Sequence, residues 1–185
     1  MAIIIKNARL SYPSLFAPSA YGDGKPTYNA TLLIPKDSDA AKAVKAEIER
    51  VAKEAFGPKA QAILTKQNEG QRRLMKDGDG PAGLTNDGDP KDGYAGHWVL
   101  KVSNKSKPTL INRAKENIDE SSGQLYGGCM VNVQVDFWAQ KNDFGNFINA
   151  KLLAVQHWGD GEAFGTVSRA NLDAFESAEE ESVDW

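Results

Sequence analysis

The sequence predicts a mainly β fold with helices inserted into one connection, followed by a flexible acidic C-terminal tail. Two patterns support this prediction: β-branched and apolar residues alternate in short segments in both halves of the chain, and one stretch between them has helical spacing. A chain of 185 residues with 41% hydrophobic residues can bury one core. We therefore expect one folded domain at residues 1–168 and a tail at residues 169–185.

Two strands are expected in the first part of the chain. Residues 3–10 and 27–34 have the alternating, β-branched composition of strands. Between them lie Pro13, Pro18 and Gly22, which are typical of turns and loops. The sequence therefore predicts a pair of strands joined by a long loop.

A helical insertion is expected next, over about residues 38–67. Asp37 and Ser38 are candidate N-cap residues, and Val44 begins a series of apolar residues at helical spacing that ends near Gly57. Residues 58–67 predict a shorter helix that has proline in its first turn.

The second half of the chain predicts a loop and then antiparallel strands. The loop covers about residues 77–96, which are dense in Gly, Asp and Pro and too long and polar to form a buried connection. Long loops of this kind are often functional. Strands are then expected at residues 98–104, 108–112, 130–140 and 147–158, the last two joined by a turn.

One face of the strand at residues 130–140 lies outside the core. Its apolar side consists of Val131, Val133, Val135 and Phe137, whereas Asn132, Gln134, Asp136 and Trp138 face the other way. Trp138 is therefore expected to be exposed. With about five or six strands and helices in one connection, a five-stranded Greek-key β-barrel of the OB type fits better than a sandwich, which needs more strands.

The glycine-rich and acidic motifs of the loop do not predict a cofactor or a metal. The run from Gly78 to Gly83 matches G-x-G-x-x-G, but no strand precedes it, and Pro81 occupies the place where a phosphate-binding helix would begin. The aspartates of the same loop lack the order of ligands of an EF-hand. We expect no cofactor and no metal, and keep adventitious metal binding by the loop as the alternative.

The remaining reactive residues show no catalytic signature, so we do not expect an enzyme. His97, His157 and the single Cys129 lack zinc-ligand spacing, and G-x-S-x-G is absent from the sequence. The N-terminal apolar run is too short for a signal peptide, and no stretch has the roughly 18 apolar residues of a membrane span. The sequence therefore predicts a soluble intracellular protein without a membrane partner.

Cations and aromatic rings occur together in several segments. Single-stranded nucleic acid offers phosphates and exposed base faces, so a groove with lysines, arginines and aromatic platforms binds it without reading its sequence. The alternative is that the cations are solvated and the rings are core. The residues expected to line the groove are Arg72, Arg73, Lys76, Tyr94, Trp98, Lys101, Lys105, Lys107, Arg113, Lys115 and Trp138.

The C-terminus differs from the rest of the chain in charge. All 22 Lys and Arg lie before residue 170, as do 19 of the 25 Asp and Glu, so the body carries about +3 while the whole chain carries -3. A solvated terminus is the plain alternative, but such a terminus needs no large apolar ring. The residues expected to bind partners are Asp173, Glu176, Glu179, Glu180, Glu181, Asp184 and Trp185.

Several short motifs in a fixed order give the chain a likeness to a known family. They are Ala8-Arg-Leu-Ser-Tyr12, Lys25-Pro-Thr-Tyr28, Tyr94 to Trp98, Tyr126-Gly-Gly-Cys129 and Gly159-Asp-Gly-Glu-Ala-Phe-Gly165. In this order, over nearly the whole body, the chain resembles the OB-fold single-stranded DNA-binding proteins of tailed bacteriophages. Its acidic tail with a terminal aromatic residue is a second likeness, although many such tails end in phenylalanine.

The resemblance implies a protein that coats and protects single-stranded DNA in phage replication, recombination and repair, in the cytoplasm of the infected bacterium. Its partners would be single-stranded DNA and, through the tail, phage or host replication and recombination proteins, with self-association left open. The alternatives are a recombination mediator or annealing protein, an RNA-binding module, and a replisome adaptor that binds protein only. A metal-dependent nuclease that uses the loop aspartates is the enzymatic alternative.

Overall fold

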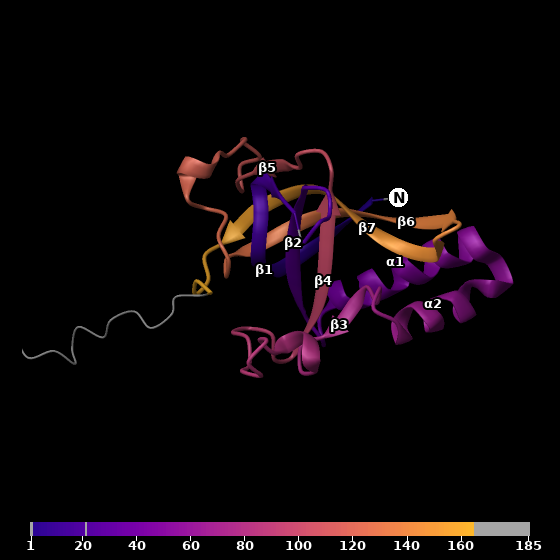
Figure 1. Cartoon of the computed structure of the whole chain (residues 1–185). Coiled ribbons are helices and arrows are strands. Elements are labelled where there is room, and N and C mark those ends of the chain that lie inside the picture. Colours follow the sequence, from indigo (N-terminus) through magenta and orange to yellow (C-terminus); the bar gives the residue numbers. More distant parts are fainter. Residues whose placement is uncertain (1, 21, 165–185) are drawn as a thin grey trace, which may run out of the picture.

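The computed structural model describes residues 2–20 and 22–164, and five of its strands form a closed barrel (Figure 1). The strands are β1 (Ala2–Ser19), β2 (Thr27–Pro35), β4 (His97–Asn104), β6 (Met130–Asn142) and β7 (Gly145–Gly159). Around the barrel the order is β1, β2, β4, β7, β6 and again β1. Every pair is antiparallel except β4 and β7, which meet in parallel at Ser103 and Lys151. This Greek-key closure confirms the predicted OB barrel.

Two short strands extend the sheet beyond the barrel. β3 (Met75–Asp77) pairs with β4, and β5 (Thr109–Ile111) pairs in parallel with β7. β5 confirms the strand expected at residues 108–112. β3 was not predicted, because three residues are too few for an alternating pattern to show.

β1 continues well beyond its predicted end at residue 10. Its pairing with β2 shifts register between Ser11 and Ser14, and again between Ser14 and Ser19. A β-bulge tolerates proline because the bulged residue leaves the hydrogen-bond ladder. Pro13 and Pro18 therefore lie within the strand, and the connection to β2 is shorter than predicted.

The helical insertion is confirmed as α1 (Asp39–Phe56) and α2 (Ala60–Glu69). Ser38 caps α1, since its side chain accepts a hydrogen bond from the Ala41 amide at 3.1 Å. The buried face of α1 packs against β6, β1 and β2, and the far end of the β6–β7 hairpin lies beside both helices (Figure 1). Within the described residues, no helix has the length and apolarity needed to cross a membrane.

Gln67 connects α2 to the edge of β7. Its side chain is 4% exposed; Nε2 donates to the carbonyl of Ile148 at 2.8 Å, and Oε1 accepts from the amide of Ile148 at 2.9 Å. Nε2 also donates to the carbonyl of Arg72 at 2.9 Å. Gln67 thus gives Ile148 the pair of hydrogen bonds that a neighbouring strand would give.

We predict that the substitution Gln67→Leu destabilises the fold by about 2 to 4 kcal/mol, because the buried amide and carbonyl of Ile148 lose their partner. Urea denaturation measures the change in the free energy of unfolding. The control is Gln61→Leu, at an exposed position of the same helix, with an expected change within about 0.5 kcal/mol. Equal stability of the two variants would show that the hydrogen bonds to Ile148 do not hold α2.

The segment between β3 and β4 is irregular, as predicted, but it is held by close hydrogen bonds. The amide of Lys91 donates to the carbonyl of Gly83 at 2.7 Å, and the amide of Gly78 donates to the carbonyl of His97 at 2.9 Å. A Cβ on Gly78 would lie 2.1 Å from the carbonyl oxygen of Tyr94, so no larger residue fits. The loop is therefore held in a fixed conformation beside β4.

Candidate nucleic-acid interface

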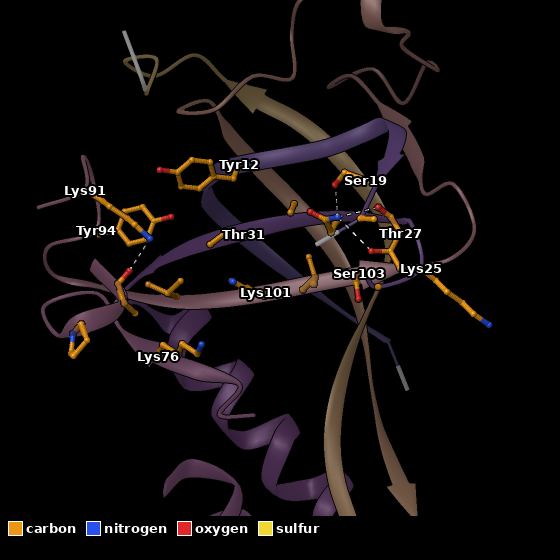
Figure 2. A pocket seen from close by; sticks show the side chains of 18 residues that line it. Tyr12, Ser19, Lys25, Thr27, Thr31, Lys76, Lys91, Tyr94, Lys101 and Ser103 are labelled. Atoms are coloured by element: carbon orange, nitrogen blue, oxygen red, sulfur yellow. Dashed lines mark hydrogen bonds between the residues drawn. The ribbon is translucent and has the colours of Figure 1, made fainter. Parts of the chain in front are cut away.

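A hollow of about 680 Å³ lies over the outer face of β2 and β4 (Figure 2). Four lysines line this hollow. Lys101 comes from β4, Lys76 from β3 and Lys91 from the loop that follows, whereas Lys25, just before β2, points its ammonium away from them (Figure 2). β2 and β4 are the second and third strands of the barrel, whose outer face is the usual oligonucleotide-binding face of OB folds. The fold therefore brings cations from three separate segments to that face.

The three lysines have no carboxylate partner among the residues that the structure describes. Burial lowers the pKa of Lys91 below its ordinary value, and the positive charges of Lys101 and Lys76 lower it further. Like charges held together without a counterion favour an anionic ligand, because the ligand relieves their repulsion. Phosphate groups are suitable anions.

Tyr12 is the exposed ring of this hollow. It sits at the bulge of β1 with φ of 44°, a conformation that is strained for a bulky residue, and its side chain is 67% exposed. The ammonium of Lys91 lies 5.7 Å from the centroid of the Tyr12 ring (Figure 2). A ring held open beside a cation can stack on a base while its neighbour binds a phosphate.

Tyr94, which was predicted to contact nucleic acid, forms a wall of the hollow. It is only 3% exposed, packs on Leu33 and Val99, and its hydroxyl is hydrogen-bonded to the Ser11 hydroxyl at 2.9 Å. Burial raises the pKa of its phenol. Its ring supports the Lys91 ammonium, which lies 5.1 Å from the ring centroid.

A second hollow of about 700 Å³ continues the first toward the β6–β7 hairpin. The two share Thr27, Lys101 and Ser103, so they form one groove that passes from β4 onto β7 and β6. Trp138, 44% exposed as its place in the alternation predicted, lines this part together with Lys105. We call the two hollows together the β4 groove.

The hairpin carries further rings near the end of the β4 groove. Phe147 is paired with Gln140 two residues beyond Trp138, and the guanidinium of Arg72 lies 4.4 Å from the centroid of its ring. Phe144, in the hairpin turn, is 85% exposed. Arg72 is thus placed at the hairpin by a contact with an aromatic side chain.

Other residues of the predicted set lie away from the β4 groove. Trp98 and Arg73 line a separate hollow of about 220 Å³ beside the helices, where the Lys45 ammonium is 4.1 Å from the Trp98 ring. Arg113 lies 4.4 Å from the Trp158 ring. Lys115, with φ of 65°, belongs to the turn after β5, and Lys107 is exposed between β4 and β5 without lining the groove.

The structure therefore brings Lys76, Tyr94, Lys101, Lys105 and Trp138 together and separates the others. Sequence reasoning missed Tyr12, Lys25, Lys91 and Lys151, which also line the groove. Alternation along β7 could have placed Lys151 on the outer face, but no local pattern marks Tyr12 or Lys91. The seven predicted partner-binding residues of the tail lie outside the described residues.

No group of three or more metal-ligating side chains occurs within residues 2–20 and 22–164. Burial raises the pKa of the Cys129 thiol above its ordinary value, and the residue belongs to the barrel core. The side chains that line the β4 groove are cations, hydroxyls, amides and rings, together with the carboxylate of Asp136.

Comparison with known proteins gives consistent results over the whole chain. The family described as Enterobacter phage Enc34, ssDNA-binding protein, matches residues 1–184. Putative protein p50 of Acyrthosiphon pisum secondary endosymbiont phage 1 is 36% identical over 190 residues, which cover 99% of this chain and 98% of that protein.

Solved structures agree with these relatives. The single-stranded DNA-binding protein from bacteriophage Enc34 in complex with ssDNA is 32% identical, with a TM-score of 0.69 over 89% of both chains. gp2.5, a single-stranded DNA-binding protein encoded by bacteriophage T7, is 14% identical with a TM-score of 0.56 over 97% of both chains, and thus shares the fold. These findings confirm the resemblance read from the sequence motifs. The chain belongs to the family of the single-stranded DNA-binding protein of Enterobacter phage Enc34.

Proposed function

We propose that this protein binds single-stranded DNA in the β4 groove without reading its sequence. The observation that carries the proposal is the cluster of Lys76, Lys91 and Lys101 between two exposed rings, Tyr12 and Trp138. Cations that follow a phosphate backbone and rings that stack on bases are the two parts of a general single-strand binding site. The family and the Enc34 complex with ssDNA support the same ligand.

The exposed rings of the site favour single-stranded DNA over duplex DNA. A base within a duplex is already stacked on both faces, so only an unpaired base can cover Tyr12 or Trp138. On β4, Lys101 and Ser103 both face outward. The usual rise of a strand places them about 6.6 Å apart. The groove therefore offers repeated contacts along an extended backbone.

In the cell, such a protein coats single-stranded DNA that phage replication or recombination exposes, and it holds that DNA unpaired. The family membership and the phage origin of the relatives support this role and a place in the cytoplasm of the infected host. Recruitment of replication proteins by the acidic tail is part of the same proposal. Its support is the charge of the tail and its terminal Trp185.

Intrinsic tryptophan fluorescence, titrated with oligo-dT at several salt concentrations, tests the proposal. We expect quenching that is lost in the variant Trp138→Phe, and an affinity that falls steeply with salt. Duplex DNA and RNA of equal length are the comparison ligands. Absence of binding at low salt, with and without the tail, would contradict the proposal and favour the adaptor.

The tail is expected to compete with DNA for the β4 groove. Phe164, the last described residue before the tail, lines a hollow of about 380 Å³ that shares Tyr12, Lys91 and Tyr94 with the groove. The carboxylates of the tail can take the place of phosphates and Trp185 that of a base, at the high local concentration of a tethered ligand.

We predict that deleting residues 173–185 strengthens oligo-dT binding at low salt, and that the gain shrinks as salt screens the charges. Equilibrium titrations of the two proteins measure it. The control replaces the six tail carboxylates by amides and keeps Trp185, which separates the effect of charge from that of the ring. Equal affinity of the deleted and full-length proteins at low salt would rule out competition.

A further inference from the structure

The residues after β7 fold back onto the barrel in a fixed way. The Tyr126 hydroxyl donates to the carbonyl of Gly161 at 2.9 Å and accepts from its amide at 3.1 Å. The amide of Phe164 donates to the carbonyl of Gly127 at 2.8 Å. We call residues 161–164 and the surface that receives them the C-terminal seat.

Arg9 of β1 is the central side chain of this seat. Its Nε donates to the carbonyl of Gly128 at 3.1 Å, and its Nη2 donates to the carbonyl of Glu162 at 2.6 Å. The same guanidinium lies 4.1 Å from the centroid of the Phe164 ring. One side chain thus satisfies two carbonyls and supports a ring, which the planar fork of arginine does and a lysine does not.

The backbone of the seat is closely fitted at three glycines. A Cβ on Gly128, whose φ is 114°, would lie 2.1 Å from the carbonyl oxygen of Glu162, and one on Gly161 would lie 2.2 Å from that of Gly128. A Cβ on Gly93 would lie 2.6 Å from the Phe164 ring. Such close approach of backbone and ring atoms indicates that residues 161–164 are packed against the folded domain.

The seat adjoins the β4 groove through the loop that carries Lys91. Phe164 packs on the cluster of Leu33, Tyr94 and Val99, directly against Gly93. Lys91 lies two residues before Gly93. Its amide donates to the carbonyl of Gly83, its carbonyl accepts from the amide of Tyr94 at 3.4 Å, and its ammonium donates to the carbonyl of Ala82 at 3.3 Å. Removal of the Phe164 ring would take away the packing on Gly93 and Tyr94 and loosen the loop on the side that faces the groove.

We propose that Arg9 and Phe164 are positioning residues for DNA binding: they hold the loop so that the Lys91 ammonium stays beside Lys76 and Lys101. This inference rests on the proposed function, because it assigns Lys91 to a phosphate.

The test uses the full-length variants Phe164→Ala and Arg9→Lys. For both we expect affinity for oligo-dT to fall about tenfold, and the salt slope to fall by about 0.7, the value for one phosphate contact in a single strand. The control is Phe56→Ala, a half-buried ring at the end of α1, which loses a similar contact without touching the groove. Its affinity is expected to match that of the wild type.

A double-mutant cycle with Lys91→Ala shows whether the two residues act through Lys91. In that background Phe164→Ala is expected to have no further effect on affinity, because the contact that Phe164 positions is already gone. A full additional loss would overturn the proposal, since it would show that Phe164 contacts DNA itself or supports another residue.

Amide hydrogen exchange without DNA separates the inference from the proposed function. Phe164→Ala is expected to speed exchange at the Lys91 and Tyr94 amides while the barrel strands stay protected. Unchanged exchange at these amides would overturn the positioning role whatever the protein binds. Failure of the wild type to bind oligo-dT, with faster exchange in the variant, would refute the proposed function and leave the seat as the support of the loop.

Discussion

Replacing Lys76, Lys91 and Lys101 together by alanine is expected to weaken oligo-dT binding by about ten- to a hundredfold at 0.15 M salt. Each phosphate contact to a single strand adds about 0.7 to the salt slope, so three lost contacts lower the slope by about 2. The lysines come from three different segments and meet in one hollow, and for this reason their effect should appear as one electrostatic unit. Titrations at four or more salt concentrations give both quantities.

The control for this variant removes the same charge elsewhere. Lys42, Lys53 and Lys66 are exposed on α1 and α2, and replacing all three by alanine changes the net charge equally. We expect it to keep nearly the whole salt slope. An equal loss in both triple variants would show that the overall charge, and not the groove, attracts DNA.

The lysine variant should fold at least as stably as the wild type. Because burial and its two neighbours lower the pKa of Lys91, the folded protein holds its charged form less favourably than the unfolded chain does. At neutral pH the cost of burying the charge and the repulsion between the lysines are both present in full, and removing the lysines removes both. A thermal unfolding midpoint that does not fall in the variant, together with weak binding, would separate the role of these residues from that of the core.

The substitution Tyr12→Gly is expected to weaken DNA binding by about 1 to 3 kcal/mol, the contribution of one stacked base, while the fold keeps its stability. Glycine adopts the positive φ of this position without strain, which offsets its larger loss of chain entropy on folding. We therefore expect the free energy of unfolding to change by less than about 1 kcal/mol. Fluorescence titration and urea denaturation measure the two effects.

Tyr12→Phe is the matched variant, because it keeps the ring and the backbone strain and removes only the hydroxyl. It should bind oligo-dT like the wild type if stacking is the contribution of Tyr12. Wild-type affinity of Tyr12→Gly would exclude a stacking role for Tyr12 and leave Trp138 as the platform.

The barrel and its helical insertion were predictable because the strands alternate and α1 begins at a capping residue, Ser38. Val131, Val133 and Val135 point inward in the structure, as their pattern indicated. The extension of β1 was not predictable from local rules, since Pro13 and Pro18 are read as strand breakers unless the bulges are known. The bulges depend on pairing with β2, and a single segment carries no information on such pairing.

The candidate site was only partly predictable from the sequence. Trp98 and Lys101 were grouped as neighbours in sequence, although residues three apart on a strand point to opposite faces. Val99 also faces outward but is buried under Tyr94, so burial along β4 does not mark its outer face. Lys91 joins the site through the folding of its loop, which composition alone does not reveal.

The parallel contact between β4 and β7 is the seam at which the barrel closes, and it is narrow. It consists of the pairing of Ser103 with Lys151, supported by the hydrogen bond from the Asn104 side chain to the carbonyl of Leu152 at 2.8 Å. The two hollows of the β4 groove meet across this seam, so DNA bound as proposed would touch both halves of the barrel. Bound DNA would then hold the two sides of the seam together. Opening of the barrel at the seam would slow, so the DNA that the protein protects would in turn stabilise the protein.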